Sequence, residues 1–123
     1  RFPKLKVYIT HGGGYVPYQL GRLAQTNQNL DVVHNKKPVL DYMKNFWFDV
    51  ELHELPMRQA LVEVIGADRL VYGSNFGGSD AVRSDLTDGL KISDSDLQKI
   101  RFRNACDLLK LDPAKIGEVK VAA

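Results

Sequence analysis

Cysteine is nearly absent from this chain, and its scarcity excludes an internal disulfide framework. The single cysteine, Cys106, is typical of a protein kept in a reducing compartment, so we expect a cytoplasmic location. Long hydrophobic runs are also missing, because no apolar stretch approaches the roughly 20 residues that a membrane span requires. We therefore expect no membrane partner.

A strong charge of one sign is missing too. The formal net charge is +2, and lysine and arginine form no stripe, so we expect no nucleic-acid partner. What is present is an ordinary globular composition: 123 residues, 44% of them hydrophobic, which suffice for one core but not two. The chain begins at Arg1 rather than methionine, so we expect a piece of a longer protein, whose preceding residues could include a targeting segment.

The most informative stretch runs from His11 to Pro17. It follows an alternating, β-branched run at residues 6–10, which predicts a strand. Three glycines at 12–14 let the backbone turn sharply and approach a ligand closely. A histidine between a strand end and a glycine loop is typical of α/β enzymes that present an imidazole at the edge of a sheet. We favour such a site role over the alternative, in which His11 only caps the loop or the next helix.

Strand and helix patterns alternate along the whole chain. We expect strands at residues 6–10, 46–50 and 70–72, and helices at 18–28, 38–43, 56–65 and from a cap at Ser93 or Ser95 to about 110. Residues expected on the core face of the last helix are Leu97, Ile100, Phe102, Ala105, Leu108 and Leu109. This order predicts an α/β fold with parallel strands and covering helices. Three strands alone would leave bare edges, so we expect residues 1–112 to be three βα units of a larger (β/α)8 barrel, followed by a tail at 113–123.

Further candidate site residues follow the second and third predicted strands. His53 stands where a barrel-mouth residue would, whereas His34 lies in a polar loop and is expected to be exposed without a site role. Asp49 and Glu51 are either acidic site residues or, as is more common, solvated loop charges. Asn75 either touches a metal or substrate or simply tolerates unusual backbone angles after a strand. The spacing of the histidines matches no compact zinc motif.

Two other site types deserve comparison with this pattern. A His-Gly-Gly-Gly run also builds the oxyanion hole of some lipases and esterases, which need a nucleophile of the form G-x-S-x-G. Residues 73–77 have the wrong spacing for that motif, and no other serine fits it. Gly77 and Gly78 resemble the loops that cradle phosphates after the last barrel strands, but two glycines are a weak signal.

Several motifs of this chain form a recognisable combination: His11-Gly12-Gly13-Gly14, Pro17, Gly21-Arg22, Phe48-Asp49, the run from Gly66 to Ser74 and the segment from Leu97 to Leu109. Together they resemble the amidohydrolase-related family, and within it most of all the aminocarboxymuconate-semialdehyde decarboxylase group. The likeness covers about residues 1–112 and implies a metal-dependent (β/α)8 barrel, of which this chain would supply the last three units.

The resemblance also implies roles for particular residues. In the family a divalent metal, expected here to be Zn²⁺, is held by a His-x-His pair on the first strand, a histidine near the fifth and an aspartate ending the eighth. The first three of these ligands are absent from this chain, and Asn75 replaces the aspartate. Its amide oxygen is neutral, so it binds Zn²⁺ less well and accepts no proton. His11 maps onto the family's general acid/base, Arg22 onto an arginine that binds a substrate carboxylate, and Gly13 and His53 join Arg22 as expected substrate contacts.

We therefore expect the full-length parent to be a lyase or hydrolase of a small carboxylated, cyclic or dienoic compound, with decarboxylation as the first choice. A hydratase or carbon–carbon hydrolase of the same family is one alternative. A metal-free barrel scaffold, suggested by Asn75, is another. The parent is expected to form a homodimer or higher oligomer. The isolated chain, with one mapped metal ligand and exposed strand edges, is expected to be inactive and to associate.

Overall fold

A three-stranded parallel sheet forms the centre of the molecule. The structure, a computed structural model, describes residues 2–29, 35, 37–80 and 84–116. The strands run in the order β1–β2–β3, with Val7 paired to Phe46 and Phe48 to Leu70. The predicted α/β fold with parallel strands is confirmed, although the strands are shorter than expected. Their bounds are Val7–Ile9 for β1, Phe46–Asp49 for β2 and Leu70–Val71 for β3.

Helices follow each strand, as the sequence pattern predicts. The α-helices are α1 (Leu20–Asn29), α2 (Val39–Met43), α3 (Leu55–Ile65), α4 (Asp94–Gln98), α5 (Asn104–Leu109) and α6 (Pro113–Ile116). Shorter 3-10 turns are η1 (His11–Gly13), η2 (Pro17–Gln19) and η3 (Ala67–Arg69), and η4 (Lys99–Arg103) is a π-helical turn. None of the described helices is both long and apolar enough to cross a membrane.

Local sequence signals explain where two of these helices begin and end. Gly66, at a φ of 84°, follows α3 and donates its N–H to the Val62 carbonyl at 2.9 Å, so a glycine ends this helix. Ser93 caps α4, because its Oγ accepts the N–H of Asp96 at 3.1 Å. Of the two serines considered as caps, Ser93 is therefore the one used.

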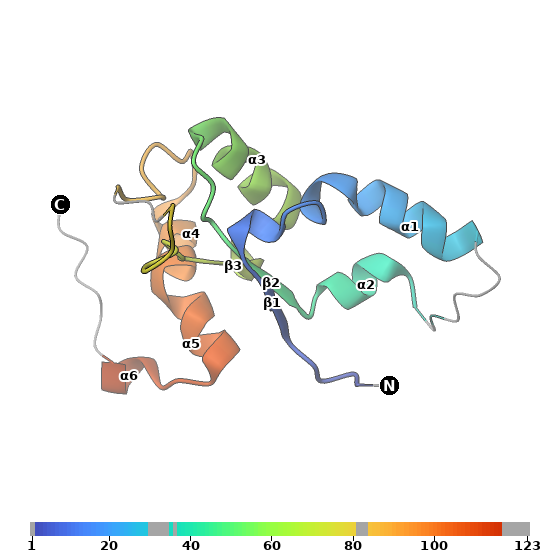
Figure 1. Ribbon diagram of the computed structural model, residues 1–123. Helices are drawn as coiled ribbons and strands as arrows, with labels where there is room; N and C mark the ends of the chain where they lie inside the picture. The colour runs from blue at the N-terminus through green and yellow to red at the C-terminus, as the bar shows by residue number, and fades with distance from the viewer. Residues whose placement is uncertain (1, 30–34, 36, 81–83, 117–123) are drawn as a thin grey trace.

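The central strand β2 is covered on both faces. Figure 1 shows α1 and α2 on one side of the strands and α4 and α5 on the other. Trp47 and Phe48, whose side chains point to opposite faces, are 4% and 1% exposed. Two cations lie over the Trp47 ring: Lys6 Nζ is 5.8 Å and Arg69 Cζ is 4.8 Å from the ring centre. The fully buried core groups the side chains of Phe48, Val50, Leu61, Leu70, Leu86 and Ile100.

The last long helical segment differs from the prediction at its end. Leu109, expected in the core, is 63% exposed, while Cys106 and Asn104 are buried. The π turn of η4 explains this difference, because its wider i→i+5 spacing rotates the following residues relative to a regular α-helix. Asn104 Nδ2 donates to the Leu70 carbonyl at 2.6 Å, and the Tyr72 N–H donates to the Ile100 carbonyl at 2.8 Å. This segment therefore holds the end of β3 in place.

Candidate active site at the strand ends

Polar side chains gather where the three strands end. His11 follows β1, Glu51 and His53 follow β2, and Asn75 and Asp80 follow β3. Because the strands are parallel, their carboxyl ends meet at one edge of the sheet. We call these five residues the strand-end cluster.

Asp49, the last residue of β2, fixes the two loops that carry most of the cluster. It is 3% exposed, and its Oδ1 accepts the N–H of Gly12 at 2.9 Å and that of Glu51 at 3.1 Å. Its Oδ2 accepts the Tyr8 hydroxyl at 3.0 Å. Burial, together with the Asp49 charge and hydrogen bond, raises the pKa of Tyr8 far above its ordinary value, so the phenol remains a donor. The alternative of solvated loop charges is wrong for both Asp49 and Glu51, which are buried.

The glycine loop packs tightly against the strand beneath it. A Cβ at Gly13 would lie 2.3 Å from the Phe48 ring, and one at Gly12 would lie 2.8 Å from the Leu52 side chain. Both glycines have positive φ, at 63° for Gly12 and 78° for Gly13. The Gly13 N–H already donates to the Thr10 carbonyl at 3.0 Å. The structure thus gives Gly13 a packing role and leaves its N–H engaged within the loop, whereas the sequence had suggested a substrate contact.

His11 contacts Glu51 and points the rest of its ring outward. Its φ is 54°, a left-handed conformation that is uncommon outside glycine and is often found at functional sites. Nδ1 makes a short contact with Glu51 Oε2, while the imidazole is 56% exposed and the carboxylate 2% exposed. A buried carboxylate on Nδ1 favours the tautomer with its proton there, which leaves Nε2 to exchange a proton with a ligand.

The second oxygen of Glu51 faces two further ligand-type side chains. Glu51 Oε1 is buried and has no hydrogen-bond partner among the described residues. His53 Nε2 lies 3.8 Å from it and also 3.8 Å from Asp80 Oδ2, and the three ligand atoms lie within 4.8 Å of one another. Two carboxylates and an imidazole suit a divalent metal such as Mn²⁺ or Zn²⁺, so the residues present fit the kind of ion that the sequence implied.

Asn75 and Arg22 occupy different surroundings. Asn75 has a φ of 52°, which confirms that it adopts unusual turn angles, and its Nδ2 donates to Asp80 Oδ1 at 2.6 Å. It therefore positions a carboxylate of the cluster. Arg22 is exposed in the first turn of α1 and makes no hydrogen bond or ion pair with the described residues, so this chain does not bring it to the cluster.

Asp80 is the site residue that sequence reasoning missed. It follows the loop that contains Gly77 and Gly78, and an acidic side chain just beyond a strand-end glycine loop is the signal that could have found it. Its negative charge also makes the phosphate cradle considered for those glycines unfavourable. His34, expected to have no site role, lies outside the described residues.

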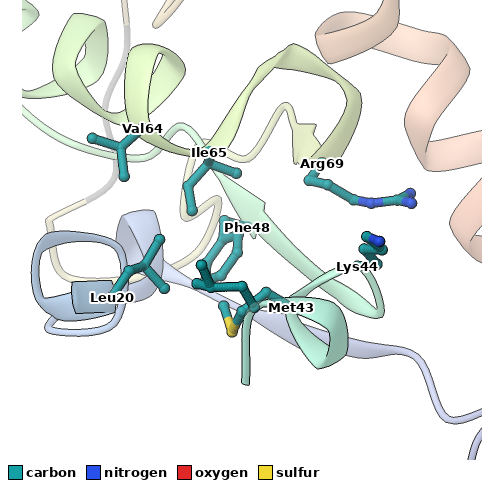
Figure 2. Close-up of a pocket in the computed structure, with 8 residues that line it drawn as sticks. Leu20, Met43, Lys44, Phe48, Val64, Ile65 and Arg69 are labelled. Atoms are coloured by element: carbon teal, nitrogen blue, oxygen red, sulfur yellow. The ribbon is translucent and has the colours of Figure 1, made fainter. Parts of the chain in front are cut away.

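Two cavities lined by described residues lie away from this cluster. One of about 190 Å³ is lined mainly by Leu20, Met43, Phe48, Val64 and Ile65, with Lys44 and Arg69 together at one side (Figure 2). Another, of about 450 Å³, lies between the edge strands and α5. No residue of the strand-end cluster lines either of them. The first is a gap between α1, α2 and α3 over the core face of β2.

Comparison with known proteins places this geometry in a family. The sequence profile of the amidohydrolase family matches residues 1–111. The chain is 30% identical over 121 residues to a 2-amino-3-carboxymuconate-6-semialdehyde decarboxylase of Dictyostelium discoideum, covering 94% of this chain and 34% of the relative. It is 36% identical over 110 residues to a 2-keto-4-carboxy-3-hexenedioate hydratase of Sphingobium, covering 87% of this chain and 29% of the relative. The chain thus spans roughly a third of the length of these curated relatives.

Solved structures give the same result. A 2,6-dihydroxybenzoate decarboxylase from Rhizobium matches with a TM-score of 0.73 and 25% identity, over 90% of this chain and 36% of that one. A dihydroxybenzoic acid decarboxylase from Polaromonas with bound manganese shows the same fold, with a TM-score of 0.70 and 24% identity over 90% of this chain and 35% of that one. The three parallel βα units correspond to about a third of such a barrel, and the chain belongs to the amidohydrolase family.

Proposed function

We propose that this chain supplies part of the active site of a metal-dependent carbon–carbon lyase that decarboxylates a small carboxylated, cyclic or dienoic compound. The observation that carries the proposal is the contact between exposed His11 and buried Glu51 at the strand ends. The similarity to named decarboxylases supports it. In this proposal residues 1–112 are three units of a longer barrel, and the remaining units complete the site.

His11 is the proposed proton carrier. When the bond to the departing carboxylate breaks, CO₂ leaves and the bonding electron pair stays on the substrate carbon, which then needs a proton. Nε2 of the imidazolium supplies it, and the Glu51 carboxylate on Nδ1 orients the ring and stabilises its charged form. A bound divalent cation, with Zn²⁺ and Mn²⁺ as the two candidates, would polarise the substrate oxygens next to that carbon.

Substrate recognition is proposed for residues around this pair. The guanidinium of Arg22 is exposed and has a planar fork that matches a carboxylate with two hydrogen bonds. Because it makes no hydrogen bond or ion pair with the described cluster residues, we propose that it serves the site of a neighbouring subunit in a homodimer or higher oligomer. His53, 55% exposed beside Glu51, faces the space a substrate would enter, and Gly13 shapes the loop beneath it.

A hydratase is the second candidate, supported by the 36% identity to a hydratase. The same His11–Glu51 pair would then move a proton while water adds across a carbon–carbon double bond. The two reactions differ in their products, because only decarboxylation releases CO₂. A metal-free scaffold, the third hypothesis from the sequence, loses support because Glu51, His53 and Asp80 place three ligand atoms within 4.8 Å of one another.

The test uses the longest available protein that contains this chain, supplied with Mn²⁺ or Zn²⁺. Carboxyl-¹³C-labelled γ-resorcylate and 2-amino-3-carboxymuconate 6-semialdehyde are incubated with it, and labelled CO₂ is followed by NMR. We expect release from at least one compound and a loss of about 10²–10⁴-fold in rate for His11→Asn, as removal of a general acid predicts. His34→Asn is the matched control and should leave the rate unchanged. An undiminished rate in His11→Asn would show that His11 carries no proton.

A further inference from the structure

Glu51 is the most unusual side chain of the cluster. Its carboxylate is 2% exposed, and one oxygen contacts His11 while Oε1 makes no hydrogen bond with the described residues. A buried charged oxygen without a partner is costly, because it has lost its water and gained nothing in return. With His11 on one oxygen and the His53 imidazole 3.8 Å from the other, the position favours a further cation beside Oε1.

The two side chains nearest to Oε1 are suited to share such a partner. His53 Nε2 is 3.8 Å away, too far for a hydrogen bond, and Asp80 Oδ2 is 3.8 Å from His53 Nε2. Ligand atoms around one small divalent ion lie roughly 3–3.5 Å apart, as metal–ligand bonds of about 2.0–2.2 Å require. The observed separations are wider, so binding an ion requires the half-exposed His53 and Asp80 side chains to move toward it.

The backbone beneath these side chains is already held in place. Arg58 is 8% exposed, and its Nη1 donates to the carbonyls of Leu52 and His53 at 2.8 and 3.1 Å. On the other side Asn75 holds Asp80 through the hydrogen bond from its amide. Arg58 thus fixes the backbone that carries His53, and Asn75 orients the Asp80 carboxylate as outer-shell partners of metal ligands usually do.

We propose that Glu51, His53 and Asp80 bind one divalent cation within this chain. The site deepens the proposed function by naming ligands that this chain supplies, but its occupancy requires neither substrate nor turnover. One nitrogen and two carboxylate oxygens bind Zn²⁺ more tightly than Mn²⁺, following the usual order of affinities. The exposure of His53 and Asp80 leaves room for water or a substrate oxygen in the remaining positions.

Isothermal titration calorimetry of the longest protein that contains this chain, with ZnCl₂ and with MnCl₂, tests this site by comparing the unaltered protein with its cluster variants. We expect one ion per chain, with Zn²⁺ binding more tightly. Glu51→Gln and Asp80→Asn should each weaken binding at least about tenfold, since changing only an outer-shell partner already costs 10–100-fold. Asp80 is 54% exposed, so its replacement leaves the core intact even if the buried Glu51 variant loses stability.

Matched controls come from carboxylates outside the cluster. Glu63→Gln alters an exposed residue of α3 that accepts a hydrogen bond from Gln59 at 3.1 Å, and Asp88→Asn alters an exposed loop residue. Both should bind the ion as the unaltered chain does. The proposal is overturned if the chain takes up no stoichiometric ion, or if the cluster variants bind as tightly as the controls. Either result would leave the proton role of His11 to be judged separately by the labelled-substrate assay.

Discussion

Two regions that share strand β2 differ in nearly every physical property. Around Phe48 and Leu61 the side chains are apolar, and these two are 1% and 0% exposed. At the end of the same strand His11 and Asn75 adopt left-handed backbone angles, and a buried Glu51 oxygen has no hydrogen-bond partner in the part of the chain that the structure describes. The loop that carries His11 packs on the core, and Asp49 hydrogen-bonds the backbone of the loops that carry His11 and Glu51. The packed core therefore determines where these polar residues lie.

Gly13 belongs to the loop of His11 and packs against the core residue Phe48, so its replacement should cause the largest loss of stability. In Gly13→Ala the new methyl would lie 2.3 Å from the Phe48 ring, whereas at Gly14 a Cβ meets nothing within 4 Å. Both glycines have positive φ, so both substitutions add backbone strain. Gly13→Ala should therefore lower the free energy of unfolding by about 1–3 kcal/mol more than Gly14→Ala, which is the usual cost of overpacking. Denaturant titration of both variants measures this difference, and equal losses would contradict the packing role.

Much of the fold could be predicted from the sequence because the deciding signals are local. Strand and helix patterns, the Gly66 stop and the Ser93 cap each depend on a few neighbouring residues, and parallel order follows from their alternation. Leu109 was misplaced because the π turn before it is not visible in an apolar pattern. The strand-end positions of His11, His53 and Asn75 also follow from the order of elements.

The rest of the site depends on contacts between distant segments. Glu51 is buried because the loop after β1 covers it, and Asp80 reaches His53 from the loop after β3. Neither contact has a local signature. The resemblance pointed to the amide oxygen of Asn75 as a metal ligand, which stays a prediction, and the structure adds a hydrogen bond from its amide nitrogen to Asp80. The choice between Zn²⁺ and Mn²⁺ is not fixed by residue types, since both ions accept carboxylate and imidazole ligands.

The smallest expected effect concerns Asp85, an ion-paired residue outside both the apolar core and the strand-end cluster. Burial alone would raise the pKa of Asp85. Hydrogen bonds from Thr87 and the nearby Arg101 guanidinium, whose Nη2 donates to Asp85 Oδ2 at 2.5 Å, outweigh this effect and lower the pKa below 3.8. The pKa of Asp85 is lower in the folded than in the unfolded chain. Its ionised carboxylate therefore stabilises the fold fully at pH values above the ordinary pKa of aspartate, and this stabilisation is lost as the pH falls through the folded-state pKa. The pair is partly exposed, so the loss should be under about 1 kcal/mol.

Thermal unfolding between neutral pH and pH 2–3 checks this expectation. Asp85→Asn should flatten part of the acid-side loss of stability, whereas Asp88→Asn should reproduce the unaltered curve. An identical pH dependence in both variants would show that Asp85 contributes nothing to acid unfolding.

The central claim is that the ligand-binding chemistry of this chain lies at the carboxyl ends of its strands. Paramagnetic broadening of backbone amide NMR signals by Mn²⁺, with Zn²⁺ as the diamagnetic reference, tests it most directly. We predict the strongest broadening at residues 51–53 and 77–80, little effect on α2 at the opposite end of β2, and none of this pattern in Glu51→Gln. Broadening centred on the exposed acidic residues of α4, or spread evenly over the surface, would contradict the account.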